Sequence, residues 1–272
     1  MKYLIILLCL LLILCIKFKI KIKFKTFFKR GFLPVRGNFG VYCYCGKQGK
    51  GKTYSVVEYM IDNKNNSVYF CNVSGIKGVD YFLFTGFIEL IYLKEIIDFN
   101  SVEDDYSDLL SFIKTKFNEE RSEYLFSLLI DLKVNKKQLV IIYDEIFTEL
   151  QKKSVINKEI MDFLCQMRKR KIIFLTTAQE WAEIPLTFRR FCRYEIDCCM
   201  LNLFIIGILI KNFKDAENMK WSDQDQEFVA PLVSNTITKC RKSISNSYDT
   251  FLRISSADLE TPTSVSPKKA RD

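Results

Sequence analysis

The segment at residues 46–53, GKQGKGKT, limits the possible folds of this chain more than any other. It matches the pattern G-x-x-x-x-G-K-[ST] at every fixed position, and its flanks have the required character. Residues 39–45 (FGVYCYC) are apolar and aromatic, as in a buried strand, whereas Tyr54, Val57 and Ile61 recur at helical spacing. This order of strand, glycine loop and helix predicts an α/β fold with an anion-binding loop, because backbone N–H groups and a helix N-terminus both attract phosphate.

The residue types within the loop predict how a nucleotide would be held. Gly46 and Gly51 allow tight backbone turns, Lys52 can reach the β and γ phosphates, and Thr53 offers a hydroxyl to Mg²⁺. The alternative is a surface turn that is merely rich in glycine and lysine, and the regular flanks argue against it. The predicted nucleotide-binding residues are Gly46, Gly49, Lys50, Gly51, Lys52, Thr53 and Tyr54.

A second motif supplies acidic side chains at the end of another strand. Residues 138–143 (QLVIIY) are mostly apolar and are followed at once by Asp144 and Glu145. In a P-loop hydrolase, Asp144 would share the Mg²⁺ site with Thr53, and Glu145 would orient and polarise the attacking water. The alternative is that the two acids cap a helix.

Further candidate residues follow a third apolar run, at residues 171–176. Because the carboxyl ends of parallel strands converge on a ligand, Thr177 or Gln179 could sense the γ phosphate. An arginine from the segment after Pro185 could reach a neighbouring subunit, although surface arginines are commonly only solvated. The three arginines are Arg189, Arg190 and Arg193, and the predicted catalytic set is Glu145, Lys52, Gln179 and Arg190.

The chain contains no histidine, which excludes Ser-His-Asp hydrolysis, imidazole acid–base catalysis and zinc sites with histidine ligands. Its 10 cysteines include no C-x-x-C pair, and most lie in apolar surroundings typical of reduced core residues. Hydrolysis in this chain would therefore depend on lysine, threonine, two carboxylates and a metal ion. ATP and Mg²⁺ are the expected cofactors, although no base-reading motif in the sequence distinguishes ATP from GTP.

The net charge of +9 is concentrated at the N-terminus, where residues 1–30 carry eight basic side chains and no acidic one. Residues 3–16 are uncharged and almost wholly aliphatic, and extension to residue 20 predicts a membrane helix with snorkelling lysines. A cleaved signal peptide is the alternative, but no small-residue cleavage site follows. The basic flank predicts a single-pass anchor in the host cell membrane with the rest of the chain in the cytoplasm.

Composition divides the chain into three parts. Residues 1–30 form the expected anchor and basic juxtamembrane segment, residues 31–232 the nucleotide-binding domain, and residues 233–272 a weakly ordered or disordered Ser/Thr-rich tail. A mainly helical insert is expected at about residues 85–137. Residues 198–210 favour two buried strands with a turn near Asn202, and a second membrane crossing is the alternative.

The motifs together resemble the zonular-occludens-toxin-like family, the morphogenesis ATPases of filamentous phages and relatives of the FtsK/HerA DNA-pumping ATPases. The likeness is carried by GKQGKGKT, SVYFCNVSG, LVIIYDE, IIFLTTAQE and IPLTFRRFCRYEID, over roughly residues 38–210. It implies nucleotide binding by Lys52 and Thr53, hydrolysis by Asp144 and Glu145, and virion assembly at the host membrane. Members of that family commonly carry the membrane segment after the ATPase domain, whereas here it comes first.

These observations predict a three-layer α/β P-loop NTPase fold with a mainly parallel sheet, preceded by a membrane helix. The expected function is a membrane-anchored, Mg-dependent ATPase that drives assembly and export of filamentous phage. Its expected partners are the membrane through residues 3–20, further copies in a ring, phage coat proteins and single-stranded DNA. Two alternatives are a catalytically idle nucleotide-binding scaffold and a DNA translocase acting in replication or conjugation.

Overall fold

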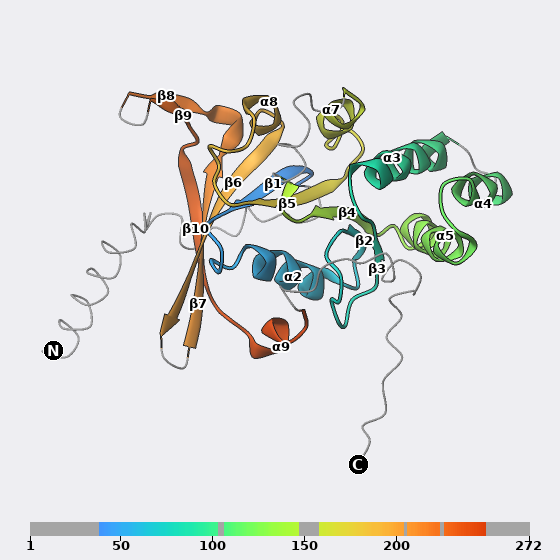
Figure 1. The fold of residues 1–272 in the computed structure, drawn as a ribbon, viewed down its shortest axis with the longest axis horizontal. Helices are drawn as coiled ribbons and strands as arrows, with labels where there is room; N and C mark the ends of the chain where they lie inside the picture. The colour runs from blue at the N-terminus through green and yellow to red at the C-terminus, as the bar shows by residue number, and fades with distance from the viewer. Residues whose placement is uncertain (1–37, 103–105, 147–157, 204–205, 224–225, 249–272) are drawn as a thin grey trace, which may run out of the picture.

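The computed structural model describes residues 38–102, 106–146, 158–203, 206–223 and 226–248 (Figure 1). The predicted membrane helix at residues 3–20, the basic segment that follows it, and the tail from residue 249 lie outside these ranges. Within the described ranges, no helix combines the length and apolar character needed to cross a membrane.

An eight-stranded sheet in the order β10-β7-β6-β1-β5-β4-β2-β3 forms the centre of the molecule (Figure 1). The strands from β6 to β3 in this order run parallel, whereas β7 is antiparallel to its two neighbours, β6 and β10. The predicted mainly parallel α/β sheet is thus confirmed. The strands are β1 (Gly40–Cys45), β2 (Ser67–Cys71), β3 (Tyr81–Leu83), β4 (Gln138–Tyr143), β5 (Ile173–Ala178), β6 (Cys192–Leu203), β7 (Ile206–Asp215) and β10 (Leu232–Lys239).

Helices cover both faces of the sheet, so every residue of β1, β2, β4 and β5 is buried. Tyr42 and Tyr44 of β1 pack on the face that carries α2 (Lys52–Asn63) and α9 (Lys242–Ser245). Val41 and Cys43 pack on the opposite face. The helices of that face are α3 (Phe87–Val102), α4 (Tyr106–Lys114), α5 (Glu119–Val134), α7 (Lys158–Cys165) and α8 (Leu186–Arg189).

Three consecutive helices, α3, α4 and α5, lie between β3 and β4, and Figure 1 shows them grouped at the right of the view, near β2 and β3. Leu90, Leu93 and Ile96 lie three residues apart on α3 and are fully buried. On α5, the side chain of Asn118 caps the helix by accepting a hydrogen bond from the Arg121 N–H.

Residues 198–203 and 206–210 belong to a long antiparallel pair, β6 and β7, and not to a helix. Cys198 pairs with Lys211, and the ladder continues to Leu203 opposite Ile206. The strand interpretation is therefore correct for residues 198–203 and 206–210, which do not form a membrane-crossing helix. Asn202, where a turn was expected, is instead a β6 residue that pairs with Gly207 of β7.

The expected boundary between the domain and a weakly ordered tail at residue 233 is wrong. Residues 232–239 form β10, which pairs with β7, and the chain then continues through α9 to Ser247. The Lys77 N–H donates to the Ser247 carbonyl at 2.8 Å, so this part of the chain reaches the loop after β2. The Ser/Thr-rich composition was misleading because a strand at the edge of a sheet tolerates polar residues, and threonine favours extended backbone.

A small two-stranded sheet lies beyond β7. It pairs β8 (Lys220–Ser222) with β9 (Glu227–Val229), and a short 3-10 helix, η2 (Ala216–Asn218), precedes it. The Trp221 and Phe228 rings meet edge to face with their centroids 5.4 Å apart. Figure 1 shows this hairpin beside the edge of the central sheet that carries β7 and β10.

Candidate nucleotide-binding site

The glycine loop connects the carboxyl end of β1 to the first turn of α2. Its start is held against β5, because the Gly46 N–H donates to the carbonyls of Ala178 at 3.3 Å and Gln179 at 3.1 Å. Within the loop, the Lys50 N–H donates to the Lys47 carbonyl at 3.2 Å. The loop is thus a fixed turn at the edge where the parallel strands end, which is where open α/β sheets bind ligands.

Two glycines in this loop cannot be replaced without strain. Gly51 has a φ of 89°, and a Cβ there would lie 2.8 Å from Leu209 Cδ1 and 3.0 Å from Met200 Cε. Gly46 has a φ of 147°, and a Cβ would lie 2.9 Å from the Cys198 carbonyl oxygen. The β6–β7 hairpin therefore packs closely against the loop and leaves no room for side chains.

Lys52 opens α2 and its side chain folds back into the loop. Its Nζ donates to the Gly46 carbonyl at 2.6 Å, and only 7% of the residue is exposed. This contact holds the ammonium group inside the curve of the loop, next to backbone N–H groups at a helix N-terminus. A phosphate bound by those N–H groups would also contact Lys52.

Thr53 and Asp144, 91 residues apart in sequence, meet at the base of the loop. The Thr53 hydroxyl donates to Asp144 Oδ2 at 3.1 Å, and the Thr177 hydroxyl donates to Asp144 Oδ1 at 2.6 Å. Burial raises the pKa of Asp144, while the hydrogen bond from Thr177 works in the opposite direction. The strand order explains why Thr53 and Asp144 are close together. Thr53 follows β1 through the loop, Asp144 follows β4, and only β5 lies between these two strands.

The oxygen atoms at this place suit Mg²⁺. Thr53 and Asp144 present a hydroxyl and a carboxylate, the hard ligands that this ion prefers. In the part of the chain that the structure describes, no group of three or more acidic or cysteine side chains could hold a metal ion. A protein-only metal cage is thus not found there, but Mg²⁺ in nucleotide sites takes most of its ligands from phosphates and water.

Glu145 follows Asp144 in a left-handed backbone conformation, with a φ of 54°. Its N–H donates to the Thr177 hydroxyl at 2.8 Å, and its side chain is exposed. The residues of β4 are all buried, and Glu145 is the first exposed residue after them. Such conformations are uncommon for residues other than glycine and often occur at functional sites.

Asn72 is a residue of this site that sequence reasoning missed. It directly follows β2, and its amide contacts Asp144 twice: Oδ1 accepts from the Asp144 N–H at 2.6 Å, and Nδ2 donates to the Asp144 carbonyl at 3.0 Å. The available signal was a polar residue at the end of a buried strand. A polar residue at that position predicts a contact with Asp144 only when β2 is known to lie beside β4.

The other predicted site residues differ in their exposure and in their hydrogen-bond partners. Gln179 is exposed at the end of β5, with its carbonyl bonded to the loop, whereas the Thr177 hydroxyl is occupied by Asp144. Tyr54 is 2% exposed, and its hydroxyl accepts from the Arg241 N–H at 2.7 Å. Gly49 and Lys50 lie at the outer turn of the loop.

Of the three arginines, Arg190 is exposed at the C-terminus of α8. Arg189 instead donates from Nε to the Ile184 carbonyl at 2.8 Å, and Arg193 donates to the Phe39 carbonyl at 3.2 Å. Two of the arginines are therefore held within the subunit. Arg190 is the one whose side chain extends from the surface.

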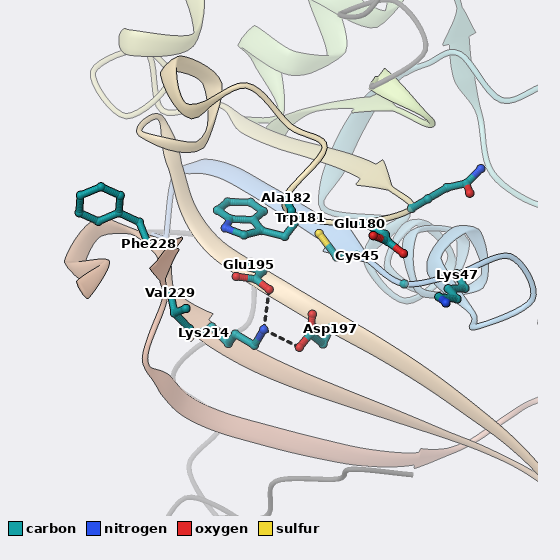
Figure 2. A pocket seen from close by; sticks show the side chains of 12 residues that line it. Cys45, Lys47, Glu180, Trp181, Ala182, Glu195, Asp197, Lys214, Phe228 and Val229 are labelled. Atoms are coloured by element: carbon teal, nitrogen blue, oxygen red, sulfur yellow. Dashed lines mark hydrogen bonds and ion pairs between the residues drawn. The ribbon is translucent and has the colours of Figure 1, made fainter. Parts of the chain in front are cut away.

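A pocket of about 340 Å³ adjoins the first residues of the loop, Gly46 and Lys47 (Figure 2). Figure 2 shows the Lys214 ammonium in contact with both Glu195 and Asp197, at 2.5 and 2.6 Å. Burial raises the pKa of Glu195 to about 7. The Trp181 ring, in the segment between β5 and α8, also lines this pocket.

The parallel sheet, the glycine loop between β1 and α2, and the Thr53–Asp144 contact together decide the fold. The chain has an α/β P-loop NTPase-like fold. The sequence matches no protein-family model and no curated protein.

Several solved structures of low sequence identity are similar. The N-terminal domain of zonular occludens toxin from Neisseria meningitidis is 15% identical with a TM-score of 0.39, covering 77% of this chain and 98% of that one. The genome packaging NTPase of Sulfolobus turreted icosahedral virus 2 with ATP-γS is 12% identical with a TM-score of 0.38, covering 71% and 98%. The flagellar accessory protein FlaH from Methanocaldococcus jannaschii is 15% identical with a TM-score of 0.35, covering 71% and 88%. Because these scores are below 0.5, the fold assignment rests on the sheet and the site themselves.

Proposed function

We propose that this chain is a Mg-dependent ATPase. The observation that carries the proposal is that Lys52, Thr53 and Asp144 converge at one end of the sheet. Thr53 and Asp144 are 91 residues apart in the sequence. A loop that only binds phosphate needs Lys52 but does not need an acidic residue beside Thr53. The buried carboxylate within hydrogen-bonding distance of the loop's threonine supports metal-dependent phosphate chemistry in addition to binding.

Each residue then has a defined task. The backbone N–H groups of the loop and the Lys52 ammonium bind the phosphates, and Thr53 and Asp144 would hold Mg²⁺, which neutralises charge on the transferring phosphoryl group. Glu145 accepts a hydrogen bond from the attacking water and orients it. Gln179 contacts the γ phosphate from the end of β5, and Arg190 of a neighbouring copy completes the site in a ring.

The proposal extends to the cellular role. The chain acts as a single-pass protein of the host membrane, anchored through residues 3–20 with the nucleotide-binding domain in the cytoplasm, and drives the assembly and export of filamentous phage. It is supported by the motifs that resemble the zonular-occludens-toxin-like family and by the basic segment at residues 17–30. Coat proteins and single-stranded DNA are the proposed partners.

The test is hydrolysis by the full chain purified in a mild detergent, with ATP and GTP compared. Lys52→Ala and Glu145→Gln should each lower turnover at least about 100-fold, because they remove phosphate binding and water orientation. Lys64→Ala and Glu123→Gln are matched controls at exposed positions and should retain activity. Equal turnover by the wild type and both site variants would refute the proposal.

Two additional measurements address the cellular role. A phage that carries Glu145→Gln should fail to release particles, and normal release would favour the idle scaffold. Stimulation of hydrolysis by single-stranded DNA would indicate a DNA motor, whereas stimulation by coat protein alone would indicate a coat-protein motor.

A further inference from the structure

The end of β2 carries a side chain that holds the acidic end of β4 by its backbone. Asn72 accepts from the Asp144 N–H at 2.6 Å and donates to the Asp144 carbonyl at 3.0 Å, while its own N–H donates to the Ile142 carbonyl at 3.2 Å. The regular β2–β4 ladder ends with Cys71 opposite Ile142. The Asn72 side chain thus continues the pairing beyond the point where the strands themselves stop.

We infer that Asn72 is a positioning residue for Asp144 and Glu145, an inference that rests on the proposed ATPase function. Two neighbouring strands hold Asp144 from opposite sides. Asn72, from β2, fixes its backbone, and Thr177, from β5, fixes its carboxylate through Oδ1 at 2.6 Å. Thr177 also accepts from the Glu145 N–H at 2.8 Å, which stabilises the left-handed turn there.

The chemistry of the amide explains why asparagine suits this position. Asp144 presents one N–H and one carbonyl, and only a side-chain amide offers an acceptor and a donor to both at once. An aspartate could accept from the N–H but could not donate to the carbonyl. An alanine would leave both backbone groups without their partner at a partly buried place.

The position of Asp144 matters because its Oδ2 lies 3.1 Å from the Thr53 hydroxyl. A displacement of about 1 Å would break that geometry and would also move Glu145, the next residue. Residues that orient a metal ligand without touching the metal typically change activity or metal affinity about 10- to 100-fold when they are replaced. Lys52 and the glycine loop do not depend on Asn72, so phosphate binding should largely survive.

The test compares Asn72→Ala and Asn72→Asp with a matched control, Gln138→Ala, in the full chain. Gln138 lies at the opposite end of β4, where its amide donates to the Lys171 carbonyl of the segment before β5 at 2.6 Å. The control therefore removes a comparable amide bridge between neighbouring strands at a distance from Asp144. Steady-state hydrolysis and hydrogen exchange of the Asp144 and Glu145 amides are the two measurements.

We expect Asn72→Ala to lower kcat about 10- to 100-fold with the KM for ATP changed less than about threefold, and to accelerate exchange of the Asp144 amide. Asn72→Asp should keep that amide protected yet still lower kcat, and Gln138→Ala should change neither measurement. A kcat near that of the wild type, a loss of ATP affinity as large as the loss of kcat, or unchanged exchange in Asn72→Ala would overturn the inference. If the wild type itself does not hydrolyse ATP, the proposed function fails, and exchange of the Asp144 amide still decides whether Asn72 holds it.

Discussion

A buried ion pair between Glu58 of α2 and Lys211 of β7 should be a large contributor to the stability of the domain. Lys211 Nζ lies 2.9 Å from Glu58 Oε2, and the two side chains are only 10% and 11% exposed. The pair joins the helix that begins in the phosphate-binding loop to the antiparallel part of the sheet. Replacement of one partner leaves the other charge buried, which typically costs about 3–5 kcal/mol.

The size of the effect depends on a neighbour. Arg241 Nη2 lies 3.7 Å from Glu58 Oε1 and would partly compensate Glu58 in a Lys211→Met variant. We therefore expect Lys211→Met to lower the free energy of unfolding by about 3 kcal/mol, at the lower end of that range. For a domain of this size, such a loss corresponds to a fall in Tm of about 6–12 °C.

The measurement is a double-mutant cycle on the full chain, with urea unfolding and thermal melts followed by circular dichroism. Glu58→Gln with Lys211→Met should be more stable than the sum of the two single changes predicts, by at least about 1 kcal/mol, because neither charge is then left alone. Additive effects, or single variants within about 1 kcal/mol of the wild type, would refute this reasoning.

Three further predictions concern the site and the pocket. Gly51→Ala should weaken nucleotide binding at least about 10-fold in a fluorescent-nucleotide titration, because a Cβ would meet Leu209 at 2.8 Å on a left-handed backbone, and unchanged affinity would contradict this. Thr177→Val should lower kcat about 10-fold or more with little change in the KM for ATP, since it removes the donor to Asp144 and the acceptor for the Glu145 N–H; equal effects on both constants would argue against positioning. Burial raises the pKa of Glu195 to about 7, so the folded state binds a proton more tightly than the unfolded one, and stability should fall as pH rises from about 4.5 to about 7. Urea unfolding of Glu195→Gln across this pH range should show a shallower fall than the wild type, and parallel curves would exclude Glu195 as the cause.

Local patterns in the sequence were sufficient for the loop and its flanking elements. The glycines and Lys52 lie where the motif predicts, and β4 ends at Tyr143 immediately before Asp144. These features depend on residues close together in the chain, so periodicity and motif spacing carry the information. The roles of Gln179 and Arg190, and the anchor at residues 3–20, stay predictions.

Other features depended on which strands become neighbours. Thr177 was a candidate phosphate sensor by position, but its hydroxyl is occupied because β5 lies directly beside β4. Tyr54 was assigned to the ligand from its place in the motif, whereas its ring is buried and its hydroxyl bonds to the backbone of Arg241, 187 residues away. Composition predicted a weakly ordered or disordered tail from residue 233, where β10 completes the sheet.

The sequence by itself thus determined that a phosphate-binding loop lies between a strand and a helix, and that an acidic pair ends another strand. Only the tertiary structure decided that Asn72 holds Asp144, that Lys211 neutralises Glu58, and that residues 232–248 are part of the domain. The physical reason is the range of the interactions. A motif requires specific residues at fixed spacing, whereas a hydrogen bond or ion pair across neighbouring strands exists only after the whole sheet has assembled.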